Sequence, residues 1–279
     1  MPVFDTPKPI SVTIDISVGD VRITAEDRSD TVVEVRPTDE TDGSDVKAAE
    51  QTSVEYADGV LVIKGPKPRA MDFSRKTRSV DVSVVLPVGS HVRGEASVGD
   101  LRCSGRLGEC RYKTSTGHAQ LDHIGALNLN TVGHVTVGRV DGDAEVRTTV
   151  GRIRIGEIDG AAVVKGSNGA VEIGKVTGDI DVRCANGDIS VDHAWGLKTD
   201  VETANGSIRV GEVTRGAVAL KTASGDLEIG IGAGRPARLD LTTGFGRVHN
   251  MLENAAESSE ESIEVRARTS YGDISVHRT

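Results

Sequence analysis

Three residues near the middle of the chain have side chains that bind metals or transfer protons. Asp100, His118 and His134 each follow a glycine, and they are spaced 18 and 16 residues apart. Two imidazoles and a carboxylate are groups that hold a divalent metal or exchange protons. If a repeat of that length stacks these glycines, the three side chains lie on consecutive strands, roughly 5 Å apart. We predict no bound metal; these three residues are the candidate ligands, and the alternative is a row of solvated turn residues.

A basic cluster lies nearer the N-terminus. The segment 65–79, GPKPRAMDFSRKTRS, carries five basic side chains in a chain whose formal net charge is −9. Such a cluster can dock an acidic partner or a phosphate group. The alternative is a solvated loop without a ligand. The predicted binding residues are Lys67, Arg69, Arg75, Lys76 and Arg78.

A repeat of about 18 residues must position these side chains. Each copy begins at a glycine, and the copies start at Gly99, Gly117, Gly133, Gly151, Gly169, Gly187, Gly206 and Gly225. Aliphatic residues stand two and four places after each glycine, as Ile153 and Ile155 do after Gly151, with polar residues between them. This period of two indicates a strand with one buried face, and a second such strand precedes the glycine. One coil cannot bury its aliphatic side chains alone, so coils must stack through parallel strand pairing. The predicted fold is all-β, a parallel β-helix (β-solenoid) of about nine coils.

The repeat does not extend over the whole chain. Residues 1–96 are predicted to form an N-terminal antiparallel β cap that is continuous with the solenoid, with a short helix near 45–52 and an early copy of the repeat at Gly19. The coils are expected over 97–249. Residues 250–279 are expected to form an acidic loop and the last strands.

Two columns of side chains follow from the alignment of the copies. An outward column of cations is neutralised by acidic residues beside it and predicts a solvated charge ladder rather than a ligand groove: Lys113, Arg147, Lys165, Arg183 and Lys221. A corner column is predicted to face outward as a hydroxyl ladder, with cysteine replacing threonine once: Thr114, Thr148, Cys184, Thr203, Thr222 and Thr243.

Composition excludes several classes of protein. The acidic balance argues against general binding of nucleic acids or anionic membranes. The N-terminal residues lack the pattern of a secretory signal, and no apolar run approaches a membrane span, so a cytoplasmic location is expected. The three cysteines follow no metal or disulfide spacing and are expected to be reduced thiols. Motifs of hydrolases, P-loop proteins, zinc proteases and dinucleotide-binding enzymes are absent, which predicts neither an enzyme nor a cofactor.

The order of these elements resembles the bacterial putative-adhesin family of β-strand repeat proteins, a domain of unknown function. The segments that carry the resemblance are SVGDVRI, VEVR, LVIKGP, VVLPVG and the serial copies of the type NGDISV. The resemblance implies a right-handed β-solenoid. It supplies no catalytic residues.

We therefore predict a non-enzymatic binding or scaffolding module whose ligand is unknown and whose partner is another protein or a second copy. The alternatives are a structural protein that assembles end to end through its last strand, GDISVHRT (272–279), a surface adhesin, and a polysaccharide-active enzyme.

Overall fold

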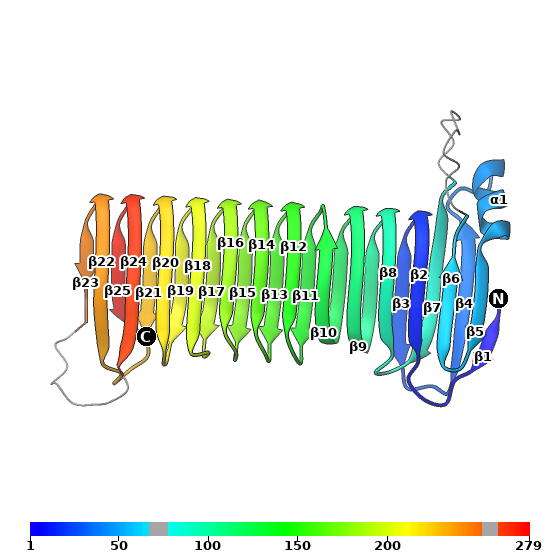
Figure 1. Ribbon diagram of the computed structural model, residues 1–279, viewed down its shortest axis with the longest axis horizontal. Coiled ribbons are helices and arrows are strands. Elements are labelled where there is room, and N and C mark those ends of the chain that lie inside the picture. The colour runs from blue at the N-terminus through cyan, green and yellow to red at the C-terminus, as the bar shows by residue number, and fades with distance from the viewer. Residues whose placement is uncertain (67–77, 253–261) are drawn as a thin grey trace. The chain divides into compact units, whose positions relative to one another are not determined.

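The computed structural model describes residues 1–66, 78–252 and 262–279. The chain divides into two compact units, residues 1–138 and residues 139–279. Both are built from β-strands that succeed one another in rungs, as the repeat predicts (Figure 1). Among the described residues no helix has the length and apolar character that crossing a membrane requires.

Unit 1 contains the elements that precede and begin the regular repeat. They are β1 (Val3–Asp5), β2 (Ser11–Val18), β3 (Val21–Glu26), β4 (Asp30–Pro37), α1 (Gly43–Gln51), β5 (Ser53–Ala57), β6 (Val60–Lys64), β7 (Val80–Pro87), β8 (His91–Val98), β9 (Leu101–Thr116) and β10 (Ala119–Thr131). The next strand, β11 (Val135–Val140), contains the boundary. The predicted short helix is α1, and its N-cap residue Asp42 accepts a hydrogen bond from the Ser44 backbone N–H at 2.7 Å.

Unit 2 contains shorter strands at regular spacing. They are β12 (Ala144–Val150), β13 (Ile153–Ile158), β14 (Ala162–Asn168), β15 (Val171–Val176), β16 (Ile180–Asn186), β17 (Ile189–Ala194), β18 (Lys198–Asn205), β19 (Ile208–Val213), β20 (Ala217–Ser224), β21 (Leu227–Ile231), β22 (Ala237–Phe245), β23 (Val248–Asn250), β24 (Ile263–Tyr271) and β25 (Ile274–Arg278).

In unit 1 the rung formed by β2 and β3 lies between strands that come much later in the sequence. β2 pairs in parallel with both β6 and β8, and β3 pairs in parallel with both β7 and β9. The antiparallel cap predicted over 1–96 is present in three pairings, β1–β4, β4–β7 and β5–β6. The parallel pairs within the same segment arise because the copy of the repeat at Gly19 forms a rung of its own.

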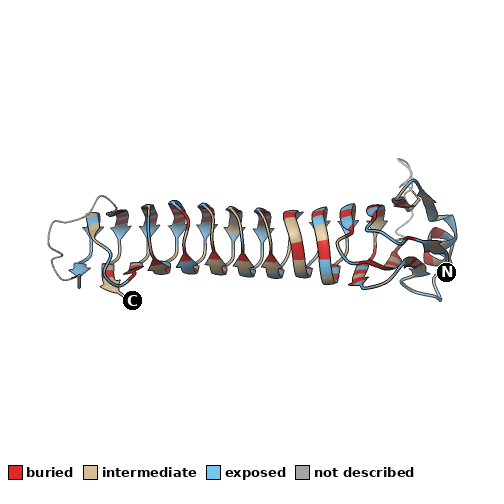
Figure 2. Cartoon of the chain, turned by 90° about the horizontal axis from the view of Figure 1, so that it is seen from below, coloured by how far each residue is buried: buried red, intermediate tan, exposed pale blue. Residues whose placement is uncertain are grey.

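In unit 2 the strands form two walls of parallel pairs. One wall joins β12, β14, β16, β18 and β20 in order, and the other joins β13, β15, β17, β19 and β21. Alternate residues of these strands are buried, as Val182, Val191 and Val201 illustrate with at most 1% exposure, and buried residues are red in Figure 2. The predicted period of two is therefore confirmed, and valine, isoleucine, leucine and alanine fill the interior.

The C-terminal segment does not follow chain order. β24 pairs with β20 on one side and β22 on the other, and β25 pairs likewise with β21 and β23. The last strand of the chain is therefore interior to the stack. The expectation that residues 272–279 offer a free edge for end-to-end assembly is wrong, because β22 and β23 form the outermost rung.

The threonine column faces inward, which corrects the prediction that it faces outward. Thr203 stands two places after the buried Val201 and so lies on the same face of its strand; it is 2% exposed. Its hydroxyl donates to the carbonyl of Gly187 at 3.3 Å. The Cys184 thiol takes the same position and approaches the carbonyl of Gly169 at 3.5 Å. The hydroxyl ladder therefore exists inside the corner.

Candidate functional site

The predicted basic cluster falls largely outside the described residues. Lys67, Arg69, Arg75 and Lys76 lie there, and Arg78 is the member that the structure places. Arg78 has a left-handed backbone, with φ of 49°. This binding site stays a prediction.

The structure brings Asp100, His118 and His134 together at one corner of unit 1. The two imidazole rings stack with their centroids 5.0 Å apart. Asp100 Oδ1 accepts the backbone N–H of His118 at 2.8 Å, and His118 Nδ1 accepts the backbone N–H of His134 at 2.9 Å. The side chain of each rung thus accepts the backbone N–H of the next rung, as Asp20 Oδ1 also does for Asp100 at 2.9 Å. Asp100 Oδ1 and His118 Nδ1, two of the atoms that could bind a metal, are thus engaged in holding neighbouring rungs together.

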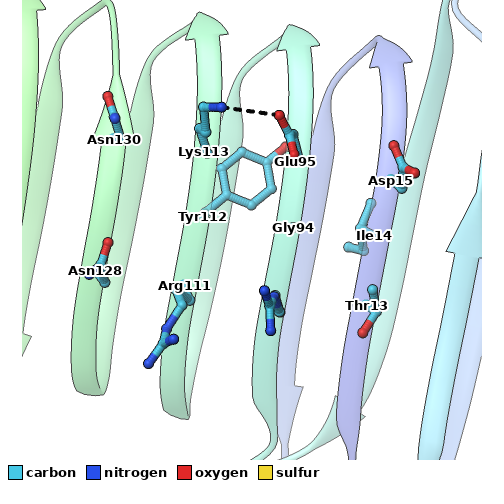
Figure 3. Close-up of a pocket in the computed structure, with 11 residues that line it drawn as sticks. Thr13, Ile14, Asp15, Gly94, Glu95, Arg111, Tyr112, Lys113, Asn128 and Asn130 are labelled. Carbon is cyan, nitrogen blue, oxygen red and sulfur yellow. Dashed lines mark hydrogen bonds and ion pairs between the residues drawn. The ribbon is translucent and has the colours of Figure 1, made fainter.

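A different group of polar side chains lines a depression on the outer face of unit 1. Strands β2, β8, β9 and β10 are neighbours there, about 4.8 Å apart as parallel strands are, and their register creates two rows. One row comprises Thr13, Arg93, Arg111 and Asn128. The other comprises Asp15, Glu95, Lys113 and Asn130. Together they surround a depression of about 410 Å³ (Figure 3).

Ion pairs neutralise part of this surface. Lys113 Nζ lies 3.3 Å from Glu95 Oε1, the contact drawn in Figure 3, and Arg111 Nη2 lies 2.7 Å from Glu109 Oε1. Arg93 and Asp15 are both exposed, and neither forms an ion pair with another described residue. Among the described residues, Arg93 therefore stands beside a second arginine without an ion pair, and Asp15 lies in register with Lys64 of β6 without a direct contact to it.

A second depression of about 260 Å³ adjoins the first along the strands. Thr13, Arg93 and Arg111 line both, and His91 and Glu109 are among the other residues that line the second. His91 Nδ1 accepts the backbone N–H of Glu109 at 2.9 Å, which ties neighbouring rungs together at that end. Arg93 consequently stands where the two depressions meet.

Below this surface an aromatic ring takes the place of a missing side chain. Gly94 lies directly opposite Tyr112 in the register of β8 and β9, and a Cβ on Gly94 would lie 2.5 Å from Tyr112 Cε2. The ring is 2% exposed, and its hydroxyl has no hydrogen-bond partner among the described residues. Burial is the main cause that raises the pKa of Tyr112, and the nearby thiols of Cys103 and Cys110 raise it further. Ring and backbone thus give the polar side chains a rigid base.

The sequence contains a signal for this site that lies outside the 18-residue period. Lys113 belongs to the predicted charge ladder, whereas Arg93 and Asp15 give no periodic signal because β2 and β8 are 80 residues apart in register. The segments SVTIDISVGD (11–20) and HVRGEASVGD (91–100) end in the same four residues. Alignment on SVGD places Thr13 beside Arg93 and Asp15 beside Glu95, as the structure does.

Coils that stack through parallel strand pairing around a narrow interior of aliphatic side chains define a β-solenoid. The chain matches the family described as Toastrack DUF4097 over residues 10–279, and it belongs to that family. No curated protein matches it.

The solved structures that the chain matches include three bacterial proteins. One is titled a putative cell adhesion protein from Clostridium sporogenes ATCC 15579, with 13% identity, coverage of 100% of this chain and 98% of that chain, and a TM-score of 0.25. A putative adhesin from Bacteroides fragilis NCTC 9343 has 13% identity, coverage of 99% and 95%, and a TM-score of 0.36. A putative adhesin from Parabacteroides merdae ATCC 43184 has 10% identity, coverage of 100% and 95%, and a TM-score of 0.40.

Proposed function

We propose that the protein is a non-enzymatic binding module that holds an acidic oligosaccharide on the outer face of β2, β8, β9 and β10. The observation that carries this function is the position of Arg93, an exposed guanidinium with no ion-pair partner among the described residues, at the junction of two depressions. A planar guanidinium with free donors is suited to a carboxylate or a sulfate group, which it binds through two parallel hydrogen bonds.

The rest of the surface favours a sugar over an acidic peptide. Asp15 and Glu95 border the first depression and offer acceptor oxygens that the carboxylates of an acidic peptide cannot satisfy. A sugar hydroxyl, by contrast, donates to a carboxylate and accepts from an amide or an ammonium group. Asn128, Asn130 and Lys113 supply such donors in the same rows. A ligand with both anionic groups and hydroxyl donors meets every polar group that lines the depression.

The size and stiffness of the face suit a ligand of a few sugar units. The depression of about 410 Å³ lies in the range typical of small-molecule sites, and the smaller one of about 260 Å³, which shares three residues with it, extends it along the strands. The side chains project from strands that are hydrogen-bonded on both sides, so their Cα positions are fixed before a ligand arrives. Preorganisation of this kind lowers the entropic cost of binding.

A comparison of three ligand chemistries tests the proposal. Wild-type protein is titrated calorimetrically with galacturonate oligosaccharides, with sulfated galactose oligosaccharides and with neutral galactose oligosaccharides; a polyglutamate peptide is the fourth arm. We expect saturable binding of the carboxylated or the sulfated sugar, and the stronger of the two identifies the anion. Binding of polyglutamate alone would replace the sugar by an acidic peptide as ligand, and binding in no arm would refute the proposal.

Arg93→Ala and a matched control connect binding to the site. Arg22 is exposed on β3, which belongs to the other wall of the same unit, and it forms no ion pair with another described residue. Loss of a charge-assisted hydrogen bond costs about 1.5–3 kcal/mol, so Arg93→Ala should weaken binding by about 10-fold to 100-fold. Arg22→Ala should leave the affinity unchanged. Replacement of the five predicted basic residues of 65–79 by Ser tests the alternative location.

The cytoplasmic location expected from the sequence stays a prediction. Fractionation of cells that express the protein from its own promoter tests it. Recovery from the envelope fraction would favour an extracellular sugar, and recovery from the cytosol alone would favour an intracellular ligand.

A further inference from the structure

The outermost rung of unit 2 leaves its interior partly open. Leu239 and Leu241 of β22 are in register with the buried Val265 and Ala267 of β24, so they point into the same interior. Both are nonetheless only half-buried, and Val248 of β23, which is in register with a buried residue of β25, is 44% exposed. Each strand pairs on one side only among the described residues.

An open rung of this kind is an unsatisfied surface. The outer edges of β22 and β23, which pair with no described strand, present backbone N–H and C=O groups in extended conformation, and such an edge is a template for another strand. At one end of β22 the rings of Phe245 and Tyr271 stack with centroids 5.1 Å apart, and they are 69% and 59% exposed. Half-buried leucines beside a free strand edge identify this rung as an interaction surface.

The side chains of β22 are complementary to a second copy of the same strand. In an antiparallel pair, opposed residues point to the same side, so inward leucines meet inward residues and outward charges meet outward residues. When Leu239 opposes Leu239 of the second copy, Arg238 opposes Asp240 and Asp240 opposes Arg238. A shift of two places either way puts Arg238 opposite itself or Asp240 opposite itself. Like charges directly opposite are destabilising, so the charges favour the Leu239 register over both of its neighbours.

We propose that β22 forms an isologous interface with a second copy of this chain. A two-fold axis through Leu239 makes β22 antiparallel to β22 of the second copy, with residues 237–241 of the two strands opposed. The half-buried leucines of the two copies then lie side by side on the inner face of this strand pair. Because the interface is self-complementary, assembly stops at two copies. Asp240 already contacts Arg268 of its own chain at 3.3 Å, so a row of alternating charges crosses the interface.

Charge reversal tests the register. Light scattering after size-exclusion chromatography should give twice the chain mass of 29.3 kDa for the wild type. Arg238→Glu and Asp240→Arg each create two like-charge contacts across the axis, so each should weaken the dimer by at least about tenfold. The double variant Arg238→Glu with Asp240→Arg restores opposite charges and should restore the dimer. Arg183→Glu, at an exposed position paired with Asp181 on an inner rung, is the control and should leave the dimer intact.

Single cysteines report the pairing directly. Leu239→Cys opposes its own copy and should yield a covalent dimer on mild oxidation, whereas Leu241→Cys opposes Ala237 and should not. Circular dichroism melting of each variant shows whether it folds. A wild type that stays monomeric at high concentration overturns the proposal, as does a mass that grows beyond two copies, which would indicate head-to-tail assembly. Cross-linking through Leu241→Cys instead of Leu239→Cys overturns the register.

Discussion

Replacement of Gly206 by alanine measures what the glycine corners contribute to the stack. Gly206 has φ of +146°, a conformation that side chains rarely adopt, and a Cβ there would lie 2.2 Å from the carbonyl oxygen of Gly187 on the rung before. No flexible side chain can move to relieve that contact, so the rungs must separate locally. Their separation weakens two hydrogen bonds, from the Gly206 N–H to Ser224 at 2.8 Å and from the Thr222 hydroxyl to Gly206 at 3.0 Å.

The cost of this substitution is the sum of strain and lost contacts. Backbone strain of this kind costs about 1–3 kcal/mol, and two weakened hydrogen bonds cost about 1 kcal/mol each. Gly206→Ala should therefore lower the free energy of unfolding by about 3–5 kcal/mol.

Two other glycines of unit 2 separate these contributions. Gly234 has φ of +71°, and no described atom lies within 4 Å of a Cβ built there. Gly234→Ala therefore introduces backbone strain without a steric clash and should lower the free energy of unfolding by about 1–2 kcal/mol. Gly160 has no left-handed φ, but a Cβ there would lie 2.5 Å from the carbonyl carbon of Gly142. Gly160→Ala therefore introduces the steric clash without the backbone strain. Urea denaturation followed by circular dichroism gives each value. If Gly206→Ala costs no more than Gly234→Ala, the tight contact between rungs is not what requires glycine.

Three further substitutions test single interactions. Tyr112→Phe removes a buried hydroxyl without a described partner and should raise the free energy of unfolding by about 1 kcal/mol in urea denaturation; a clear loss would show that the hydroxyl is satisfied. The pKa of Glu157 is lowered mainly by its hydrogen bond with Lys175, so this carboxyl stabilises the fold above about pH 4.5 and ceases to do so as the pH falls through its lowered pKa. The Tm difference between wild type and Glu157→Gln should therefore be largest at neutral pH and vanish in acid, and a constant difference would contradict this. Cys184→Thr should be neutral or slightly stabilising in thermal melting, because a hydroxyl replaces the weaker thiol donor toward Gly169, and a large loss of Tm would show that the corner cannot hold the extra methyl.

The repeat in the sequence was sufficient to predict the regular part of the fold. A period near 18 with aliphatic residues two and four places after each glycine predicted parallel rungs, and Val182 and Val201 lie buried opposite each other as expected. The order of the rungs at both ends was not predictable from periodicity. A copy of the repeat predicts that a rung exists, but it does not predict which rungs lie beside it. Strands that pair with partners distant in sequence are β2, β3, β24 and β25.

The candidate site shows the same limit. Proximity of Asp100, His118 and His134 followed from consecutive copies, but the pattern did not show that Asp100 and His118 accept backbone N–H groups of the next rung. Arg93 and Asp15 became neighbours only through the early rung. Side chains that lie close because one rung inserts between two others leave no periodic signal, although the shared SVGD of the two segments was visible.

The side-chain resonance of Arg93 tests the central claim most directly. Nitrogen-15 spectra of the arginine Nε–H groups are recorded while a galacturonate oligosaccharide is added, with assignments from Arg93→Lys and Arg22→Lys. The account predicts a saturable shift of Arg93, accompanied by the side-chain amides of Asn128 and Asn130 in the same depression, while Arg22 stays unchanged. An unmoved Arg93, or equal shifts of Arg93 and Arg22, would contradict a binding site on this face.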